Sequence, residues 1–453
     1  MQISLHHYVG LLHALAVTAG LLLYVGLTHS GRQRRPPTAA IAWVVFIVAF
    51  PYAAIPAFLL FGTRKLLLST SPVLTVRKPG GGWPDALATG LGLPAAHGNR
   101  SVEFFPDGSS ALDALLQLIA GARHSLDLAT FILADDTAGR RVVAGLADCV
   151  RRGVRVRVLL DGIGHLGRRR RITAMLASAG VGMRWFQSAG AQPRWERLNL
   201  RNHRKLVIAD GMRLWTGGRN LADEYFGIDP ATGWADISCV IDGPLARDAA
   251  ALFEHDWSGA AAQADVQLSM PGSQDGHRVQ LVPCGPDRRD DSAYDYLLAA
   301  IHRADHRVLA ATPYFVPDEA LLQALILACK RGVDVCLVIP ARSNHVLADI
   351  ARDRSLRELA AAGGCVLLYP RMLHAKALVA DDSIGFCGSV NLDGRSLFLN
   401  FELHLAFLDP ADVAALASCI AGFRDGAAAY RPRAPGLVRD IVEGFVRSIG
   451  FQL

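Results

Sequence analysis

Charge is almost absent from the first part of this 453-residue sequence. No Asp, Glu, Lys or Arg precedes Arg32, and residues 36–63 contain none either. The apolar stretches Tyr8–Thr28 and Ala39–Phe61 are each long enough to cross a bilayer as a helix. A cleaved signal peptide is disfavoured, because the start lacks basic residues and a small-residue cleavage site. We therefore expect residues 1–63 to form a two-helix membrane anchor.

Two prolines interrupt the second apolar stretch. Pro51 and Pro56 should kink this helix or make it partly re-entrant. Basic residues flank the stretch on both sides, within 32–35 and again within 64–78. The positive-inside rule is therefore nearly balanced, and it leaves open which side of the membrane holds the rest of the chain.

Paired cysteines are also missing. Eight cysteines are scattered along the chain without a CxxC or a Cys/His zinc spacing. Most lie in apolar runs, so we expect buried free thiols and no bound metal. Free thiols slightly favour a reducing compartment for the protein.

Lysine is scarce, and its positions are informative. The chain has five lysines against 42 arginines, and two of the five lie in a duplicated pattern, His-x-Lys-x4-Asp. The copies are His203, Lys205 and Asp210, and then His374, Lys376 and Asp381. Each is followed at the same offset by two small residues and an asparagine: Gly217, Gly218 and Asn220, then Gly388, Ser389 and Asn391. Chance does not explain two matches with matching tails, so we predict one active site built from two half-sites.

The residue types suit phosphoryl chemistry. A His and a Lys two positions apart on a strand point to the same face, and Asp210-Gly211 predicts a hairpin turn after it. Two imidazoles can supply a nucleophile and a general acid. Lysine ammonium groups and asparagine amides can hold the phosphate oxygens in place of a metal.

Each histidine needs a group that orients it. Asp236 and Glu402 are the predicted orienting acids, because each begins an apolar strand-like run after a motif. An ordinary carboxylate at the start of a strand is the competing interpretation.

Alternating strand and helix patterns follow the same order twice, which indicates an α/β fold with a repeated domain. We expect a linker over 64–100, a first domain over 101–258 and a second over 278–430. The end of the chain, 431–453, contains an amphipathic pattern from Leu437 to Ile449. Such a helix packs on its own domain more often than it lies on a membrane.

The duplicated motif resembles the signature of the phospholipase D superfamily, HxK(x4)D(x6)G[GS]xN. That resemblance implies two α/β/α sandwich domains with pseudo-twofold symmetry, preceded here by the two transmembrane helices. It implies metal- and cofactor-free catalysis through a phosphohistidine, with His203 and His374 as nucleophile and acid/base. Lys205, Lys376, Asn220, Asn391 and Ser389 would then lie around the phosphate, and Asp236 and Glu402 would orient the imidazoles. In that family the motif residues Asp210 and Asp381 are more structural than catalytic.

The whole chain is similar to bacterial cardiolipin synthases. The similarity extends to Leu60-Phe-Gly-x-Arg-Lys65 and to Tyr314-Phe-x-Pro-Asp318, whose aromatic pair is suited to an acyl or glycerol group or to packing in a rigid loop. It implies phosphatidyl transfer between two phosphatidylglycerol molecules in the inner (cytoplasmic) membrane, with release of glycerol. The similarity does not indicate an oligomeric state.

Three alternatives remain open. A phospholipase D hydrolase would use water as the acceptor and release phosphatidic acid. Further arginines surround the first motif, at 197, 201 and 204, and the positive potential that they would add there favours His203 as the nucleophile. A membrane-tethered nuclease would use these arginines and Arg168–Arg171 on phosphates, although we expect no nucleic-acid partner. A non-enzymatic scaffold is disfavoured, because both motifs are intact.

Overall fold

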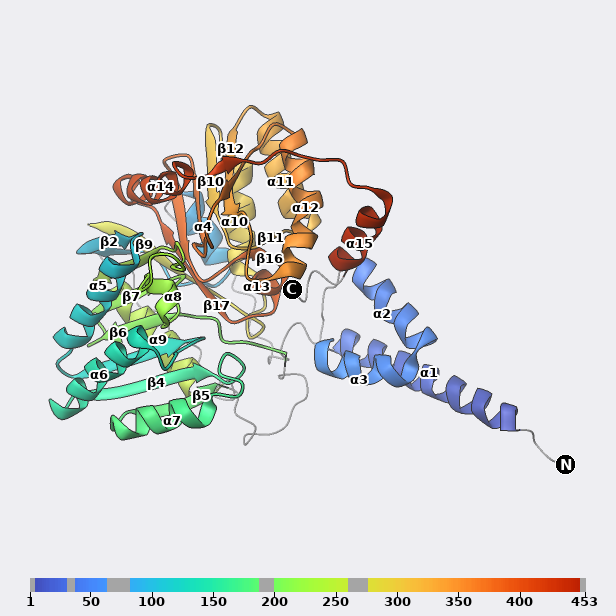
Figure 1. The fold of residues 1–453 in the computed structure, drawn as a ribbon, viewed down its shortest axis with the longest axis horizontal. Coiled ribbons are helices and arrows are strands. Elements are labelled where there is room, and N and C mark those ends of the chain that lie inside the picture. The colour runs from blue at the N-terminus through green and yellow to red at the C-terminus, as the bar shows by residue number, and fades with distance from the viewer. Residues whose placement is uncertain (1–4, 31–36, 63–81, 187–198, 260–275, 449–453) are drawn as a thin grey trace. The chain divides into compact units, whose positions relative to one another are not determined.

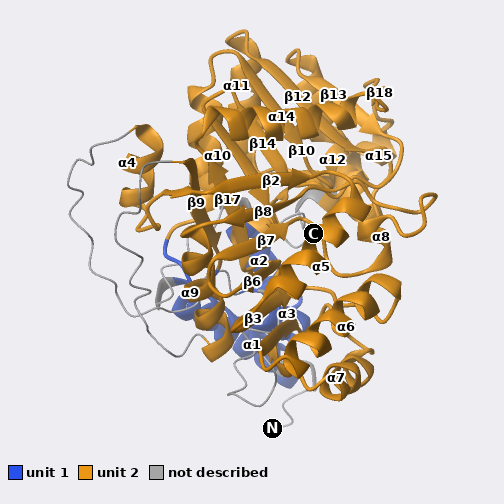
Figure 2. Ribbon diagram, turned by 90° about the vertical axis from the view of Figure 1, so that its left-hand side faces the viewer, with its two compact units in different colours: residues 1–71, 189–200, 286–289 blue, residues 72–188, 201–285, 290–453 orange. Residues whose placement is uncertain are grey.

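The computed structural model describes residues 5–30, 37–62, 82–186, 199–259 and 276–448 (Figure 1). These residues divide into two compact units, each of which is described by itself (Figure 2). Unit 1 comprises 1–71, 189–200 and 286–289, and unit 2 comprises 72–188, 201–285 and 290–453.

The described N-terminal part of unit 1, residues 5–62, is mainly helical. Its helices are α1 (Leu5–Ser30), α2 (Pro37–Ala49) and α3 (Pro51–Phe61). Tyr24, Ile47, Ala54 and Phe58 form their shared core. Among the described residues, α1 is the one helix long and apolar enough to cross a membrane, through Tyr8–Thr28 with mean hydropathy 1.9.

The second apolar stretch is not one continuous helix. It breaks at Phe50, and α3 starts at Pro51, where a proline needs no amide hydrogen bond. The rings of Trp43 on α2 and Phe58 on α3 lie 5.1 Å apart. In a straight helix these residues would be about 22 Å apart. The two helices therefore fold back on each other, in keeping with the kinked or partly re-entrant segment expected at the prolines, and a second full span over Ala39–Phe61 is not confirmed.

Unit 2 contains two large sheets with the same strand order. The first runs β2 (Ser101–Phe105), β8 (Ser238–Asp242), β7 (Arg213–Gly217), β6 (Leu206–Ala209), β3 (Ser125–Thr130), β4 (Arg155–Asp161), β5 (Gly182–Phe186). The second runs β1 (His97–Asn99), β9 (His277–Cys284), β17 (Glu402–Phe407), β15 (Ile384–Gly388), β14 (Ala377–Ala380), β10 (Arg307–Ala311), β12 (Asp334–Pro340), β13 (Cys365–Tyr369), β18 (Ala428–Ala429). Without its edge strands β1 and β18, the second sheet repeats the first strand for strand.

The helices repeat in the same order. The first half has α5 (Gly108–Gly121), α6 (Thr137–Arg151), α7 (Arg169–Ser178), α8 (Asp223–Phe226) and α9 (Leu245–Ser258). The second half has α10 (Ser292–Arg303), α11 (Glu319–Lys330), α12 (Val346–Ala361), α13 (Gly394–Phe398) and α14 (Pro410–Arg424). Helices α5 to α7 pack on one face of the first sheet, and α10 to α12 on one face of the second. Helices α9 and α14 form a shared core with both sheets, so they hold the two halves together.

Part of the expected linker 64–100 belongs to the fold. Helix α4 (Trp83–Gly90) packs on the second half through Ala88, and the ring of Trp83 lies 6.2 Å from that of Tyr296. Strand β1 pairs with β9. Residues 82–100 thus complete the second sheet, which the Gly- and Pro-rich composition does not reveal.

Candidate active site

The two motifs occupy equivalent hairpins in the two halves of unit 2. Strands β6 and β7 pair from Leu206↔Thr216 to Ala209↔Arg213, and β14 and β15 pair from Ala377↔Cys387 to Ala380↔Ile384. Each His-x-Lys segment directly precedes the first strand of its hairpin, and each Gly-rich pair lies at the end of the second. This register brings the small residues of each motif back beside its lysine, and the amide of Gly388 donates to the carbonyl of Lys376 at 3.2 Å. The position of each asparagine beside its histidine stays a prediction.

Backbone contacts cross between the halves at both histidines. The amide of His203 donates to the carbonyl of Phe401 at 2.8 Å, and the amide of His374 donates to that of Ala235 at 2.6 Å. Each acceptor is the residue just before an orienting acid of the opposite half. The chain therefore places each acid beside the histidine of the other motif.

The side chains follow this crossed arrangement. His203 Nδ1 lies 3.0 Å from Glu402 Oε2, and His374 Nδ1 lies 2.7 Å from Asp236 Oδ2. The two carboxylates have no exposed surface. Both predicted acids are thus paired with histidines, but in an exchanged order that sequence proximity does not predict.

Glu402 is held by a set of donors. Its carboxylate accepts hydrogen bonds from Ser389 Oγ, from Ser396 Oγ at 2.6 Å and from Asn400 Nδ2 at 3.2 Å. Burial alone would raise the pKa of Glu402, but the neighbouring His203 and Lys205 lower it to about 2. The carboxylate therefore stays ionised and fixes the ring of His203.

Asp236, unlike Glu402, accepts a hydrogen bond from a backbone amide. Its Oδ1 accepts from the amide of Ile237 at 2.7 Å. A Cβ atom at Gly218 would lie 2.2 Å from that oxygen, so a side chain there would displace the carboxylate that orients His374. The equivalent residue in the second half is Ser389, whose hydroxyl instead binds the longer Glu402. This difference explains why one motif reads Gly-Gly and the other Gly-Ser.

Both histidines favour the neutral state in the empty site. Burial, together with Lys376, lowers the pKa of His374 to about 3, and burial also lowers the pKa of His203. With Nδ1–H donated to a carboxylate, each ring presents the lone pair of Nε2. Either imidazole can therefore attack phosphorus, and a bound anion would favour protonation of the other.

The two lysines are buried cations beside the imidazoles. Lys205 Nζ donates to the carbonyl of His203 at 2.6 Å, and Lys376 Nζ donates to that of His374. Burial lowers the pKa of both, to about 8 for Lys376. A bound phosphate would offset this loss of hydration, so both groups suit anion binding.

The asparagines of the motifs have unsatisfied polar atoms. Asn220 and Asn391 are buried, and Oδ1 of each lacks a hydrogen-bond partner in the described part of the protein. Unpaired buried amides are uncommon in folded proteins and need an explanation such as a ligand. An unpaired amide oxygen accepts a hydrogen bond, so these atoms suit a donor such as a hydroxyl of a bound headgroup. Contact of the asparagine Nδ2 groups with phosphate oxygens stays a prediction.

The motif aspartates lie away from this centre. Asp210 accepts from the amides of residues 123–125 at 2.7–2.9 Å, and Asp381 accepts from those of 305–307 at 2.9 Å. Both have positive φ, 54° and 53°, in the hairpin turn. Their geometry fastens the hairpin to the start of the neighbouring strand and provides no contact with a reacting atom.

Aromatic rings line the imidazoles, and the sequence did not identify them. Phe131 lies 5.1 Å from the ring of His203, while Tyr225 and Trp234 lie 5.0 and 5.5 Å from that of His374. Tyr225 comes five positions after Asn220, and this closeness to the first motif was the one feature of the sequence that could have identified it as a site residue. These rings exclude water from the histidines, which strengthens the charge interactions there.

One arginine expected at the basic surface is internal. Arg204 has no exposed surface and donates to Asp256 Oδ1 at 2.5 Å and to the carbonyl of Glu402 at 3.1 Å. It therefore supports the segment that holds Glu402. Arg197 lies outside the described residues.

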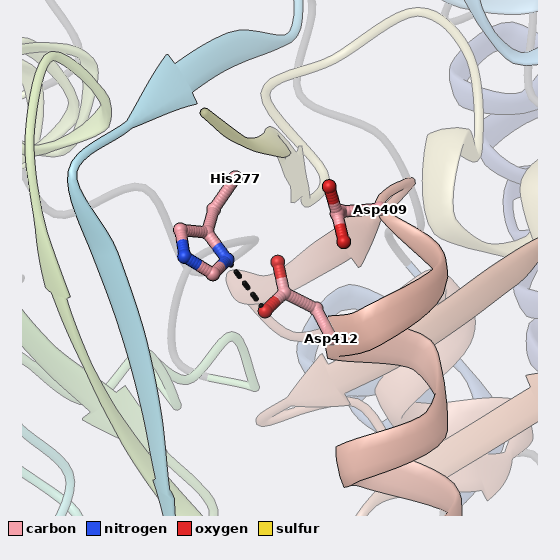
Figure 3. Close-up of side chains that lie close together, drawn as sticks. All are labelled: His277, Asp409 and Asp412. Carbon is pink, nitrogen blue, oxygen red and sulfur yellow. Dashed lines mark hydrogen bonds and ion pairs between the residues drawn. The ribbon is translucent and has the colours of Figure 1, made fainter. Parts of the chain in front are cut away.

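In the described part of the chain, one group of side chains has metal-ligating types: His277, Asp409 and Asp412 (Figure 3). His277 Nδ1 is 2.8 Å from Asp412 Oδ1, and Asp409 caps α14 by accepting from the amide of Ala411 at 2.9 Å. The pair ties β9 to α14, as His97 and Asp248, 2.8 Å apart, tie β1 to α9. The group shares no residue with the motifs. All eight cysteines are free, and five of them are buried.

Comparison with known proteins identifies the family. A family model described as "Cardiolipin synthase, PLD-like domain" matches residues 115–257 and 297–421. The chain belongs to this family, and the two matched segments are the two halves that carry the motifs.

Curated relatives extend the match over most of the chain. It is 32% identical to cardiolipin synthase A of Pseudomonas entomophila (strain L48) over 432 residues, which cover 89% of this chain and 88% of that one. It is 31% identical to cardiolipin synthase A of Pseudomonas syringae pv. syringae (strain B728a), with 89% and 88% covered.

A solved structure shares the fold at low identity. It is phosphatidylserine synthase of Haemophilus influenzae Rd KW20, at 14% identity and a TM-score of 0.63, covering 81% of this chain and 99% of that one. This likeness supports the arrangement of the two sheets.

Proposed function

We propose that this protein is a membrane-associated cardiolipin synthase that transfers a phosphatidyl group from one phosphatidylglycerol to another. The observation that carries the proposal is the crossed pair of His–carboxylate contacts, with two buried lysines, in a chain of the cardiolipin synthase family. The enzyme is a phosphatidyltransferase of the phospholipase D superfamily.

In the first half-reaction, Nε2 of His203 attacks phosphorus of the donor lipid. A P–N bond forms, and the P–O bond to the headgroup glycerol breaks. His374, protonated at Nε2 when the anionic lipid is bound, gives its proton to the leaving oxygen. Glu402 stabilises the positive charge that develops on the ring of His203.

In the second half-reaction, a hydroxyl of a second phosphatidylglycerol attacks the phosphohistidine. His374 accepts the proton of that hydroxyl, the P–N bond breaks, and cardiolipin forms. Lys205, Lys376, Asn220 and Asn391 hold the non-bridging oxygens through both steps. The assignment of His203 as the nucleophile rests on its greater side-chain exposure, 14% against 6% for His374.

The contacts of Arg204 remove one argument for that assignment. Its charge is paired with Asp256 and does not raise the potential on the side of the site facing the substrate. Ring exposure and the three hydrogen-bond donors that anchor Glu402 remain as the support.

We also propose that the helical unit 1 holds the enzyme in the inner membrane. Helix α1 is suited to cross the bilayer, whereas α2 and α3, with 13 and 11 residues, span about 20 and 16 Å each and are shorter than its hydrocarbon core. Their hairpin suits a segment that enters and leaves by the same face. Two full crossings remain the alternative, and reporter fusions before α1 and after α3 would separate the two topologies.

The product lipids test the proposed reaction. Purified enzyme in phosphatidylglycerol vesicles should form cardiolipin and glycerol in equal amounts, with phosphatidic acid a minor product, as measured by mass spectrometry. Phosphatidic acid as the main product would indicate a hydrolase. Turnover of nucleic acid alone would overturn the lipid substrate.

A further inference from the structure

The C-terminal helix α15 (Leu437–Ser448) presents its apolar side to the outside of unit 2. Leu437, Val438, Ile441 and Val442 recur at helical spacing on one face and are all exposed, Leu437 by 78% and Ile441 by 63%. Single exposed apolar residues are ordinary, but four on one face of a terminal helix form a patch that needs a partner.

The opposite face of α15 packs on the protein, and it does so mainly through charge. Glu443 accepts hydrogen bonds from Arg357 on α12 and from Arg439 at 3.0 Å, and Arg439 also pairs with Asp353 on α12. Val446, 5% exposed, is the apolar contact on this side. The helix therefore packs on its own domain, as expected, through Arg439, Glu443 and Val446, while Leu437, Val438, Ile441 and Val442 stay exposed.

A second pair of exposed apolar residues lies at the start of α12, which the end of α15 contacts. Val446 shares a small core with Val316, Ala348 and Ala351, so the end of α15 lies against the first turns of α12. There Val346 and Leu347 are exposed, by 72% and 48%. We use the name apolar rim for six residues: Val346, Leu347, Leu437, Val438, Ile441 and Val442.

A chain of contacts connects the start of α12 to the active site. The short strand β11 (Phe315–Val316) pairs with β16 (Leu392–Asp393), which directly follows Asn391. Tyr314, just before β11, donates to Asn344 Oδ1 at 2.6 Å, and its ring lies 5.3 Å from that of His345. His345 immediately precedes Val346. The rim therefore lies beside the strand pair that carries the asparagine of the second motif.

Basic residues accompany this surface. Arg431 and Arg433 are exposed in the segment that leads into α15. An apolar helix face next to exposed arginines is the combination that binds the interface of an anionic bilayer. Phosphatidylglycerol, the substrate of the proposed reaction, is such an anionic lipid.

We propose that the apolar rim docks unit 2 onto the anionic phospholipid bilayer beside the active site, so that lipid headgroups reach the histidines without leaving the membrane. This proposal rests on the proposed function. Docking by the rim is separate from anchoring by α1, because α1 keeps the chain at the membrane whereas the rim sets which surface of unit 2 faces the lipid.

Photo-crosslinking tests the contact without requiring turnover. The full-length protein would be reconstituted in vesicles of phosphatidylglycerol that carries a diazirine in an acyl chain, irradiated, and mapped by mass spectrometry. We expect lipid adducts in the peptides of 437–448 and 346–347, as well as in α1. Adducts confined to 5–61, or cross-links from α15 to those helices or to a second copy, would overturn lipid docking.

A pair of variants links the contact to turnover. Ile441→Ser combined with Val442→Ser should lower turnover of vesicle phosphatidylglycerol by roughly tenfold or more, because it removes two apolar side chains that the bilayer interface would bury. Turnover of dispersed short-chain phosphatidylglycerol and the Tm should stay unchanged, because both residues are exposed. Leu327→Ser on α11, at a 46% exposed leucine outside the rim, is the matched control and should have no effect.

The two substrates separate the possible failures. Loss of short-chain turnover in the wild type would contradict the proposed function. Normal vesicle turnover by the rim variant, with short-chain turnover intact, would contradict the docking surface alone.

Discussion

Crossed pairing of the acids and histidines predicts how four variants should group. Glu402→Gln should behave like His203→Gln, because Glu402 contacts His203, and Asp236→Asn should behave like His374→Gln. The partners of each group are 199 and 138 residues apart in sequence. If each acid instead oriented the histidine of its own half, Asp236→Asn would behave like His203→Gln.

The size of the effect follows from the charge interaction. The pKa of Glu402 is lowered from 4.5 to about 2, which corresponds to a differential interaction on the order of 3 kcal/mol. Because an imidazolium develops opposite the carboxylate, loss of that charge should slow the chemical step by roughly 100-fold. Glu254→Gln, at a 55% exposed carboxylate that pairs with Arg157, is the control and should leave the rate unchanged.

The leaving group distinguishes the two groups of variants. A p-nitrophenyl ester of phosphatidic acid releases a phenolate that needs no proton, so it should rescue a variant that lacks the general acid but not one that lacks the nucleophile. The burst of p-nitrophenol measures this first step. With His203 as the nucleophile, Asp236→Asn and His374→Gln should recover, whereas Glu402→Gln and His203→Gln should not. Recovery of Glu402→Gln together with His374→Gln would refute the crossed pairing, whichever histidine is the nucleophile.

Three further results are expected. Asp381→Asn should lower the Tm, because it weakens three hydrogen bonds from backbone amides worth about 1–2 kcal/mol in total. It should leave kcat within about twofold; scanning fluorimetry measures the Tm and a lipid assay measures kcat. A collapse of kcat at unchanged Tm would contradict the structural role of Asp381. The free energy of unfolding should fall as the pH drops below 6.5 toward about 3, because His374 binds a proton in the unfolded chain but stays neutral when buried. Denaturant titrations should show a shallower fall with pH in His374→Gln. Equal slopes in the two proteins would argue against His374 as the cause of the fall. Removal of residues 1–63 should weaken membrane retention strongly but preserve turnover in detergent micelles, since neither motif lies there. An intact fold without micelle turnover would show that unit 1 contributes to the site.

The repeated architecture could be predicted because each half carries its own strand and helix periodicity. The hairpins after Lys205 and Lys376, and the β-α-β order around them, follow from local patterns. The acids Asp236 and Glu402 could be identified as well, since each begins a strand after a motif. Local pattern therefore gave the elements and the residue types of the site.

The pairing of each acid with the histidine of the opposite half could not be predicted. It depends on where the segments before Asp236 and Glu402 run relative to the opposite hairpin, and one sequence contains no signal for that contact. The break at Phe50 was underestimated for a related reason: Pro51 is compatible both with a kinked helix and with the start of a new one. Residues 82–100 were expected to be a linker because their glycines and prolines conceal a short helix and an edge strand.

The outward apolar face of α15 departs from expectation in a similar way. The spacing of Leu437 and Ile441 predicts an amphipathic helix, and amphipathic helices generally bury that face. Here Arg357 and Glu443 supply a polar contact that holds the opposite face. Which face packs is decided by the partner surface on α12, and helical periodicity does not contain that information.

Trapping the covalent intermediate tests the central claim most directly. Wild-type enzyme would be mixed with the p-nitrophenyl ester, quenched within the burst and digested, and the peptides mapped by mass spectrometry under conditions that preserve phosphohistidine. The account predicts a phosphatidyl group on His203 and none on His374, with the adduct absent from His203→Gln. An adduct on His374 alone would reverse the two roles, and a quenched burst without any histidine adduct would contradict the two-step mechanism.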